Sequence, residues 1–110
     1  MPQRHHAKSP PRIDAHHHVW RLARGDYGWL TADKGTIYRD YDIADLKPFV
    51  DEAGITGTVL VQAAPTEAET EYMLARAKAS GGLVKGVVGW VDMASKDAPA
   101  NIARLAKQPL

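Results

Sequence analysis

Two histidines separated by one residue, His16 and His18, are the residues of this chain whose types and spacing best suit chemistry. In an extended strand alternate side chains point to opposite faces, so these two should face one side of a sheet and His17 the other. Neutral imidazole is a common ligand for divalent transition metals, but a zinc site takes three or four protein ligands. The pair therefore predicts half of a metal site, with a metal-free substrate site or a hydrogen-bonded structural pair as the alternatives.

The composition limits what else could complete such a site. Cysteine is absent, so a metal would have to be held by imidazole and carboxylate groups alone. The other two histidines, His5 and His6, lie in a polar N-terminal stretch and are expected to be solvated rather than ligands.

Three apolar runs are expected to form the strands that position the pair. They cover residues 13–19, 55–64 and 83–91, and the second and third are apolar on consecutive positions, as in strands buried on both faces. In the third run Gly86 and Gly89 are expected to allow close packing.

Helical patterns separate these runs. Thr66 and Glu69 form a T-x-x-E capping box that predicts a helix over residues 66–80. An apolar stripe predicts a second helix over 42–53, in which Pro48 should cause a kink or mark a later start. A third helix should open at Asp97, with Pro99 close behind it.

The alternation of strand and helix predicts the α/β class with a parallel sheet. The carboxyl ends of parallel strands carry the functional residues of such folds, and His16 and His18 precede a long loop there. Gln62, near the end of the second strand, and Asp92, closing the third, are further candidates for substrate contacts. Gln62 could equally bond to neighbouring backbone, and Asp92 could serve as a cap.

The long loop covers residues 19–41 and is rich in aromatic side chains. A loop of more than about 12–15 residues in a compact domain is usually functional or disordered, and the aromatic content argues against disorder. The loop could form a lid that packs onto the sheet end, or it could contact the substrate. Its aromatic residues are Trp20, Tyr27, Trp29, Tyr38 and Tyr41.

Charge and hydropathy exclude several other classes of protein. The net charge is +1, and residues 1–12 hold three basic residues without an acid, so no basic surface remains for nucleic acid. No stretch approaches the ~20 apolar residues that span a bilayer, and the N-terminus lacks the apolar run of a secretory signal. We expect a flexible tail over residues 1–12, a domain over 13–110, and a cytoplasmic location.

The segments IDAHHHVW, DYGWL, GITGTVLVQA, EAETEYML and GVVGWVDM together resemble the N-terminal part of the amidohydrolase-2 group of the amidohydrolase superfamily, in its lactonase-like branch. The resemblance covers roughly residues 12–110. It implies an eight-unit TIM barrel whose first strand ends in a metal-binding H-x-H pair, here His16 and His18. Further histidines and an aspartate would come from later strands.

The resemblance also implies a function. It points to a hydrolase acting on a lactone or related ester of a sugar acid or ring-cleavage product, with a divalent metal such as zinc, or with the histidines acting directly. A barrel runs to about 250 residues, so 110 residues supply about three of eight units, and we expect a truncated, inactive part. The alternatives are a superfamily decarboxylase and a non-enzymatic α/β module whose open strand edges favour self-association.

Overall fold

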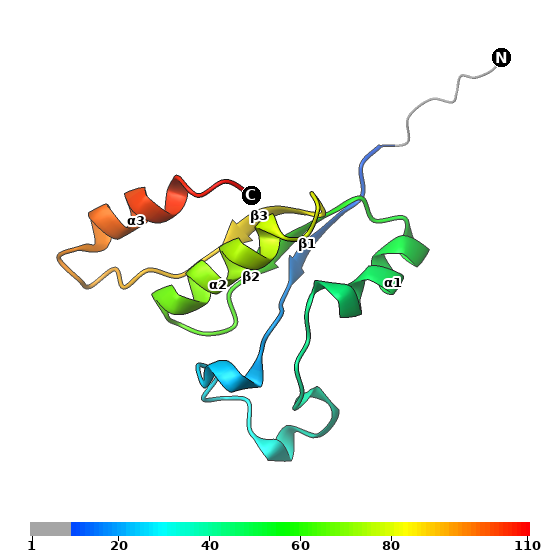
Figure 1. Cartoon of the computed structure of the whole chain (residues 1–110), viewed down its shortest axis with the longest axis horizontal. Coiled ribbons are helices and arrows are strands. Elements are labelled where there is room, and N and C mark those ends of the chain that lie inside the picture. The colour runs from blue at the N-terminus through cyan, green and yellow to red at the C-terminus, as the bar shows by residue number, and fades with distance from the viewer. Residues whose placement is uncertain (1–9) are drawn as a thin grey trace.

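The computed structural model describes residues 10–110, so His5 and His6 lie outside the described residues. Three strands alternate with three helices, as the sequence predicts (Figure 1). The elements are β1 (Ile13–His17), α1 (Ile43–Ala53), β2 (Gly57–Val61), α2 (Glu67–Lys78), β3 (Val84–Val88) and α3 (Ala98–Ala106). Two 3₁₀ segments, Leu22–Arg24 and Ala32–Ile37, lie between β1 and α1. None of the helices in this part of the chain is long and apolar enough to cross a bilayer.

The three strands form one parallel sheet in the order β1, β2, β3, which confirms the predicted α/β class. Each strand ends earlier than the apolar pattern predicts. β1 ends at His17, and three residues later Trp20 pairs with Tyr41 of the long loop in an antiparallel bridge. Loop pairing therefore replaces sheet pairing beyond the strand end.

The hydrophobic core lies between α2 and one face of the sheet (Figure 1). Met73 and Ala77 of α2 are buried against Leu60 and Val84 of the strands. Complete burial of such a side chain stabilises the fold by about 1.5–3 kcal/mol. The opposite face is more open, because Ile13 and Val88 remain about half exposed there.

Helix α1 begins at Ile43, directly after Asp42, the first residue of the predicted range, and the alternative of a later start at Pro48 is wrong. Asp42 and Asp45 form a reciprocal capping box at the N-terminus, and the helix continues through Pro48 to Ala53. The cap satisfies hydrogen-bond donors of the first turn, so the helix tolerates the loss of the one hydrogen bond that Pro48 cannot donate.

Only half of the capping box predicted at the start of α2 forms. Thr66 accepts a hydrogen bond from the Glu69 backbone amide at 3.0 Å, as predicted. The Glu69 side chain turns into the protein interior instead of returning to the Thr66 amide. Local spacing predicts the first contact, and tertiary contacts redirect the second.

Gly86 in β3 and Gly89 directly after it differ in their roles. A Cβ atom at Gly89 would lie 2.5 Å from Thr70 Cγ2 of α2, so the predicted close packing is confirmed there. A Cβ at Gly86 would meet nothing within 4 Å, so the same prediction is wrong for Gly86.

Candidate active site

His16 and His18 lie beside each other at the carboxyl end of β1. Their ring centroids are 5.0 Å apart and the ring planes meet at 74°. Both side chains are exposed, whereas His17 between them is buried and hydrogen-bonded to Thr58. The alternation of the strand thus directs two imidazoles away from the helix-covered face and one toward it.

The tautomer of His18 follows from its hydrogen bond. Its Nδ1 lies 2.8 Å from the Val61 carbonyl oxygen, which can only accept. Nδ1 therefore carries the proton, and the neutral ring keeps a free lone pair on Nε2. Metal-binding histidines are commonly oriented in this way by a backbone carbonyl.

His17 supports the strand rather than the site. Its Nε2 lies 2.9 Å from Thr58 Oγ1, and the Thr58 side chain is fully buried. Burial lowers the pKa of His17 below its ordinary value of 6.5, so the ring is neutral at neutral pH. This neutral contact joins β1 to β2 directly behind the exposed pair.

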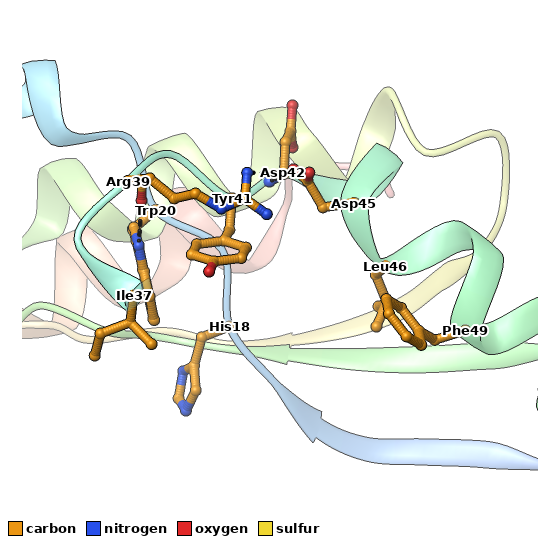
Figure 2. Close-up of a pocket in the computed structure, with 9 residues that line it drawn as sticks. All are labelled: His18, Trp20, Ile37, Arg39, Tyr41, Asp42, Asp45, Leu46 and Phe49. Atoms are coloured by element: carbon orange, nitrogen blue, oxygen red, sulfur yellow. Dashed lines mark hydrogen bonds and ion pairs between the residues drawn. The ribbon is translucent and has the colours of Figure 1, made fainter. Parts of the chain in front are cut away.

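Two hollows border His18. The larger, of about 550 Å³, lies between the long loop and α1 (Figure 2). Its walls are Trp20, Ile37, Arg39 and Tyr41 from the loop and Asp42, Asp45, Leu46 and Phe49 from the start and body of α1. The second hollow, of about 390 Å³, is bounded by His18, Trp20, Trp29 and Ala63. His18 and Trp20 belong to both, so the two hollows meet at the carboxyl end of β1.

The aromatic loop packs on itself and also lines these hollows. Trp20 stands edge-on to Trp29, with centroids 5.2 Å apart, and edge-on to Tyr41 at 5.5 Å. The Trp20 indole donates to the Arg39 carbonyl, and the Trp29 indole donates to the Ala63 carbonyl, each at 2.8 Å. The loop is thus tied together by its own side chains and joined to the segment after β2.

Sequence reasoning missed several residues of this region. Arg39, Asp42 and Asp45 line the larger hollow but carry no motif in the sequence. The spacing of Thr66 and Glu69 predicts a capping role for Glu69, yet the Glu69 side chain is fully buried and bonds to residues of the loop. These positions depend on how distant segments meet, which local spacing does not encode.

Gln62 and Asp92, the two other predicted contact residues, are not among the residues that line the described hollows. Gln62 follows the last residue of β2, and its backbone amide donates to the Val88 carbonyl at 2.9 Å. Asp92 is exposed in the loop after β3, where its Oδ1 accepts from the Ala94 amide. A substrate-contact role for either residue stays a prediction.

The donor set suits a borderline divalent ion but is incomplete. Within residues 10–110, no three histidine, aspartate or glutamate side chains gather closely enough to hold a metal. His16 and His18 supply two imidazoles of the kind that zinc prefers, with the lone pair of His18 Nε2 left free. The pair fits part of a zinc site, to which other side chains would have to contribute.

Comparison with known proteins places this arrangement in a family. Residues 13–110 match the amidohydrolase family. The chain is 46% identical over 98 residues to an L-fucono-1,5-lactonase from Burkholderia ambifaria, covering 89% of this chain and 33% of that protein. It is 33% identical over 92 residues to an L-fucono-1,5-lactonase from Burkholderia multivorans, covering 84% of this chain and 31% of that protein.

Solved structures agree with the sequence matches. An amidohydrolase from Burkholderia multivorans with bound zinc superposes with a TM-score of 0.77 at 32% identity, covering 86% of this chain and 33% of that one. A second crystal form of an amidohydrolase from that species, with bound HEPES, gives a TM-score of 0.81 at 31% identity, covering 92% of this chain and 35% of that one. The chain thus spans about a third of the length of the relatives it matches. From its sequence match, its parallel β/α architecture and its histidine pair, the chain belongs to the amidohydrolase family.

Proposed function

We propose that this chain forms the first part of a lactone hydrolase that opens the ring of a sugar-acid lactone. The observation that carries the proposal is the pair of adjacent imidazoles of His16 and His18 at the carboxyl end of β1. This is the edge at which β/α barrels place their active sites. The similarity to two L-fucono-1,5-lactonases suggests the chemical class of the substrate.

We also propose that His16 and His18 contribute two ligands to a divalent metal, with zinc favoured by the relative solved with that ion. A bound divalent ion supplies Lewis acidity toward the lactone carbonyl and lowers the pKa of bound water. In this chain, the His18 Nδ1 proton held by Val61 directs Nε2 away from the strand and toward the ligand side. The general base is expected from a part of the fold beyond Leu110.

The proposal also covers substrate contacts, the partner and the location of the protein. Gln62 and Asp92 remain weaker candidates for contacts with the sugar hydroxyls. We propose a small-molecule substrate, a homo-oligomeric assembly and a cytoplasmic location.

A graft tests whether this segment can serve as the start of such an enzyme. Residues 13–110 would replace the matching third of the Burkholderia ambifaria lactonase, and hydrolysis of L-fucono-1,5-lactone would be followed together with zinc content. We expect a folded, zinc-containing, active graft. His16→Ala and His18→Ala should each lower kcat/KM by roughly 100-fold or more and reduce the zinc content.

Lys107→Ala, an exposed change at the end of α3, is the matched control and should leave both quantities unchanged. A graft that unfolds cooperatively at the temperature of the parent enzyme yet neither binds zinc nor hydrolyses the lactone would refute the proposal. Full activity in the two histidine variants would refute their assigned roles.

A further inference from the structure

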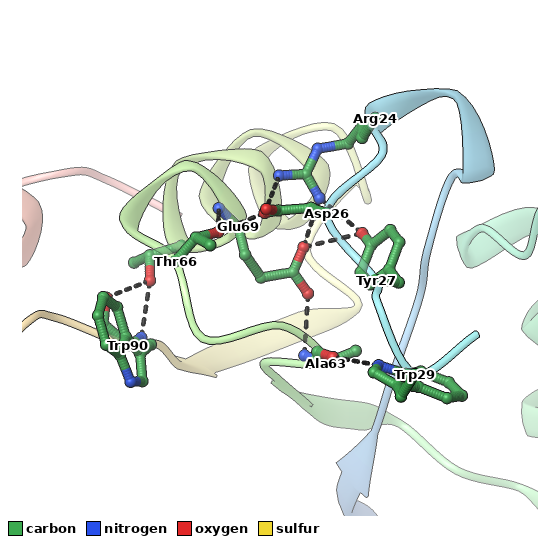
Figure 3. Close-up of polar contacts among 9 residues, drawn as sticks. Arg24, Asp26, Tyr27, Trp29, Ala63, Thr66, Glu69 and Trp90 are labelled. Atoms are coloured by element: carbon green, nitrogen blue, oxygen red, sulfur yellow. Dashed lines mark hydrogen bonds and ion pairs between the residues drawn. The ribbon is translucent and has the colours of Figure 1, made fainter. Parts of the chain in front are cut away.

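Glu69 of α2 is a buried carboxylate whose side chain contacts two separate parts of the chain, the long loop and the segment after β2 (Figure 3). Its Oε1 accepts from Arg24 Nη1 at 2.6 Å and from the Tyr27 hydroxyl at 2.8 Å. Its Oε2 accepts from the Ala63 backbone amide at 2.9 Å. One side chain thus joins the long loop, the segment after β2 and the first turn of α2.

Burial of this charge costs free energy that its partners must offset. A buried carboxylate is tolerated only when it is paired and hydrogen-bonded, and both Glu69 oxygens meet that condition. The N-terminal end of α2 also favours a negative charge in its first turn. Burial, together with the hydrogen bond to Glu69, raises the pKa of Tyr27 above its ordinary value of 10, so the phenol stays a donor.

The backbone of Ala63 links Glu69 to the smaller hollow. Its N–H donates to Glu69, and its carbonyl oxygen accepts from the indole of Trp29 at 2.8 Å (Figure 3). Trp29 and Ala63 are two of the four residues that line the smaller hollow, and His18 is another. Glu69 therefore reaches a wall of the candidate site through the backbone of one residue, Ala63.

We propose that Glu69 is a positioning residue for substrate binding, which fixes the Trp29 ring through Ala63 as the wall of the hollow beside His18. The ligand class is a pyranoid (six-membered) sugar lactone, whose C–H face packs against the aromatic wall while its carbonyl carbon approaches the histidine pair. The identity of this ligand rests on the proposed function. The contact chain from Glu69 to Trp29 does not.

The test uses the 110-residue chain and two-dimensional ¹H–¹⁵N NMR, with Glu69→Gln compared with Glu71→Gln on the exposed side of the same helix. In a glutamine an NH2 donor replaces one of the two oxygens, so either Arg24 or the Ala63 amide then faces a donor instead of an acceptor. In Glu69→Gln we expect hydrogen exchange at the Ala63 amide and the Trp29 indole to accelerate by at least about tenfold. In Glu71→Gln neither should change.

The Trp90 amide reports whether the whole helix has loosened. It donates to Thr70 Oγ1 at 2.7 Å, one residue beyond Glu69 on α2. Unchanged exchange at Trp90 with faster exchange at Ala63 and Trp29 supports a positioning role. Equal acceleration at all three groups, or at none, overturns it.

Two further measurements keep the inference testable. If Glu69→Gln does not fold, Tyr27→Phe removes one hydrogen bond to Oε1 without removing the charge, and a smaller acceleration of about threefold is expected at Ala63 and Trp29 but not at Trp90. No acceleration there contradicts the inference. Titration with L-fucose, a stable pyranose, should shift the Trp29 indole resonance, and the affinity should fall at least threefold in Glu69→Gln or, if needed, Tyr27→Phe.

If L-fucose does not shift the Trp29 indole resonance of the unmodified chain, the assignment of a pyranoid ligand is wrong. These outcomes are independent of the graft experiment, because none requires turnover. If the graft lacks lactonase activity but the shift of the Trp29 indole resonance depends on Glu69, the proposed function is refuted and the positioning role of Glu69 is retained.

Discussion

The Nδ1 atom of His18 lies 2.8 Å from the carbonyl oxygen of Val61, which joins the end of β1 to the end of β2. This contact requires the Nδ1–H tautomer and leaves Nε2 unprotonated in the neutral ring. We expect long-range ¹H–¹⁵N correlations of the chain above pH 7.5 to show a protonated Nδ1 for His18. The Nε2–H tautomer as the main form would contradict the contact.

The histidine pair should bind zinc weakly through both rings. Two imidazoles give less affinity than the three or four ligands of a complete site, so we expect the ring resonances of His16 and His18 to respond together to added Zn²⁺. His18→Asn keeps a donor near Val61 but removes the Nε2 position. This variant should lose at least about tenfold in zinc affinity and retain its fold.

His16→Ala should weaken zinc binding in the same way, whereas Lys107→Ala should not. Zinc affinity that is unchanged in both histidine variants would show that the ion binds elsewhere.

The hydroxyl of Thr58 is expected to stabilise the fold through His17. Thr58→Val preserves the shape of the side chain but leaves a buried His17 ring without its partner, which should lower the free energy of unfolding by about 1–3 kcal/mol. Thr58→Ser keeps the hydroxyl and loses one methyl group, at a cost of about 1 kcal/mol. Urea denaturation measures both, and a valine variant as stable as the unmodified chain would contradict the role of the hydrogen bond.

Asp42 combines a helix cap with an ion pair, and two substitutions separate them. Its carboxylate accepts from the Ile43 amide and pairs with both Arg76 Nε at 3.0 Å and Nη2 at 2.7 Å. Asp42→Asn keeps a capping side chain and weakens the partly exposed ion pair, so we expect a loss of about 0.5 kcal/mol. Asp42→Ala removes both and should cost about 1–2 kcal/mol.

Helical content by circular dichroism, followed through urea denaturation, distinguishes these outcomes. Equal stability of the asparagine and alanine variants would show that the cap contributes nothing.

Gly86 lies in β3 and Gly89 directly follows it, and alanine substitutions at the two positions form a matched comparison. Gly89→Ala places a Cβ 2.5 Å from Thr70 Cγ2, and Thr70 is itself fixed by hydrogen bonds to the Trp90 backbone. We expect a loss of about 1–3 kcal/mol from this overpacking. Gly86→Ala meets open space and should be neutral or stabilise the fold by up to about 1 kcal/mol. The order of the two melting temperatures checks the prediction, and the reverse order would contradict it.

The sequence predicts the order of strands and helices better than it predicts the contacts of the site. The order of strands and helices follows from hydrophobic runs and helix caps, because these signals act over a few neighbouring residues. The strand ends were overestimated, since Trp20 pairs with Tyr41 and β3 stops at Val88 although apolar residues continue to Val91. An apolar run shows where a strand can form, but only pairing partners show where it ends.

By itself the sequence determined that His16 and His18 share one face, because strand alternation has a period of two and requires no knowledge of other segments. It also determined the parallel α/β class and the resemblance to the amidohydrolases. Only the tertiary structure decided that the Val61 carbonyl fixes the tautomer of His18 and that His17 is hydrogen-bonded to Thr58. It also decided that the Glu69 side chain accepts a hydrogen bond from the Ala63 amide instead of capping its own helix. Each of these contacts joins residues from different elements, and the energy of a buried hydrogen bond depends on which distant groups the fold brings within reach.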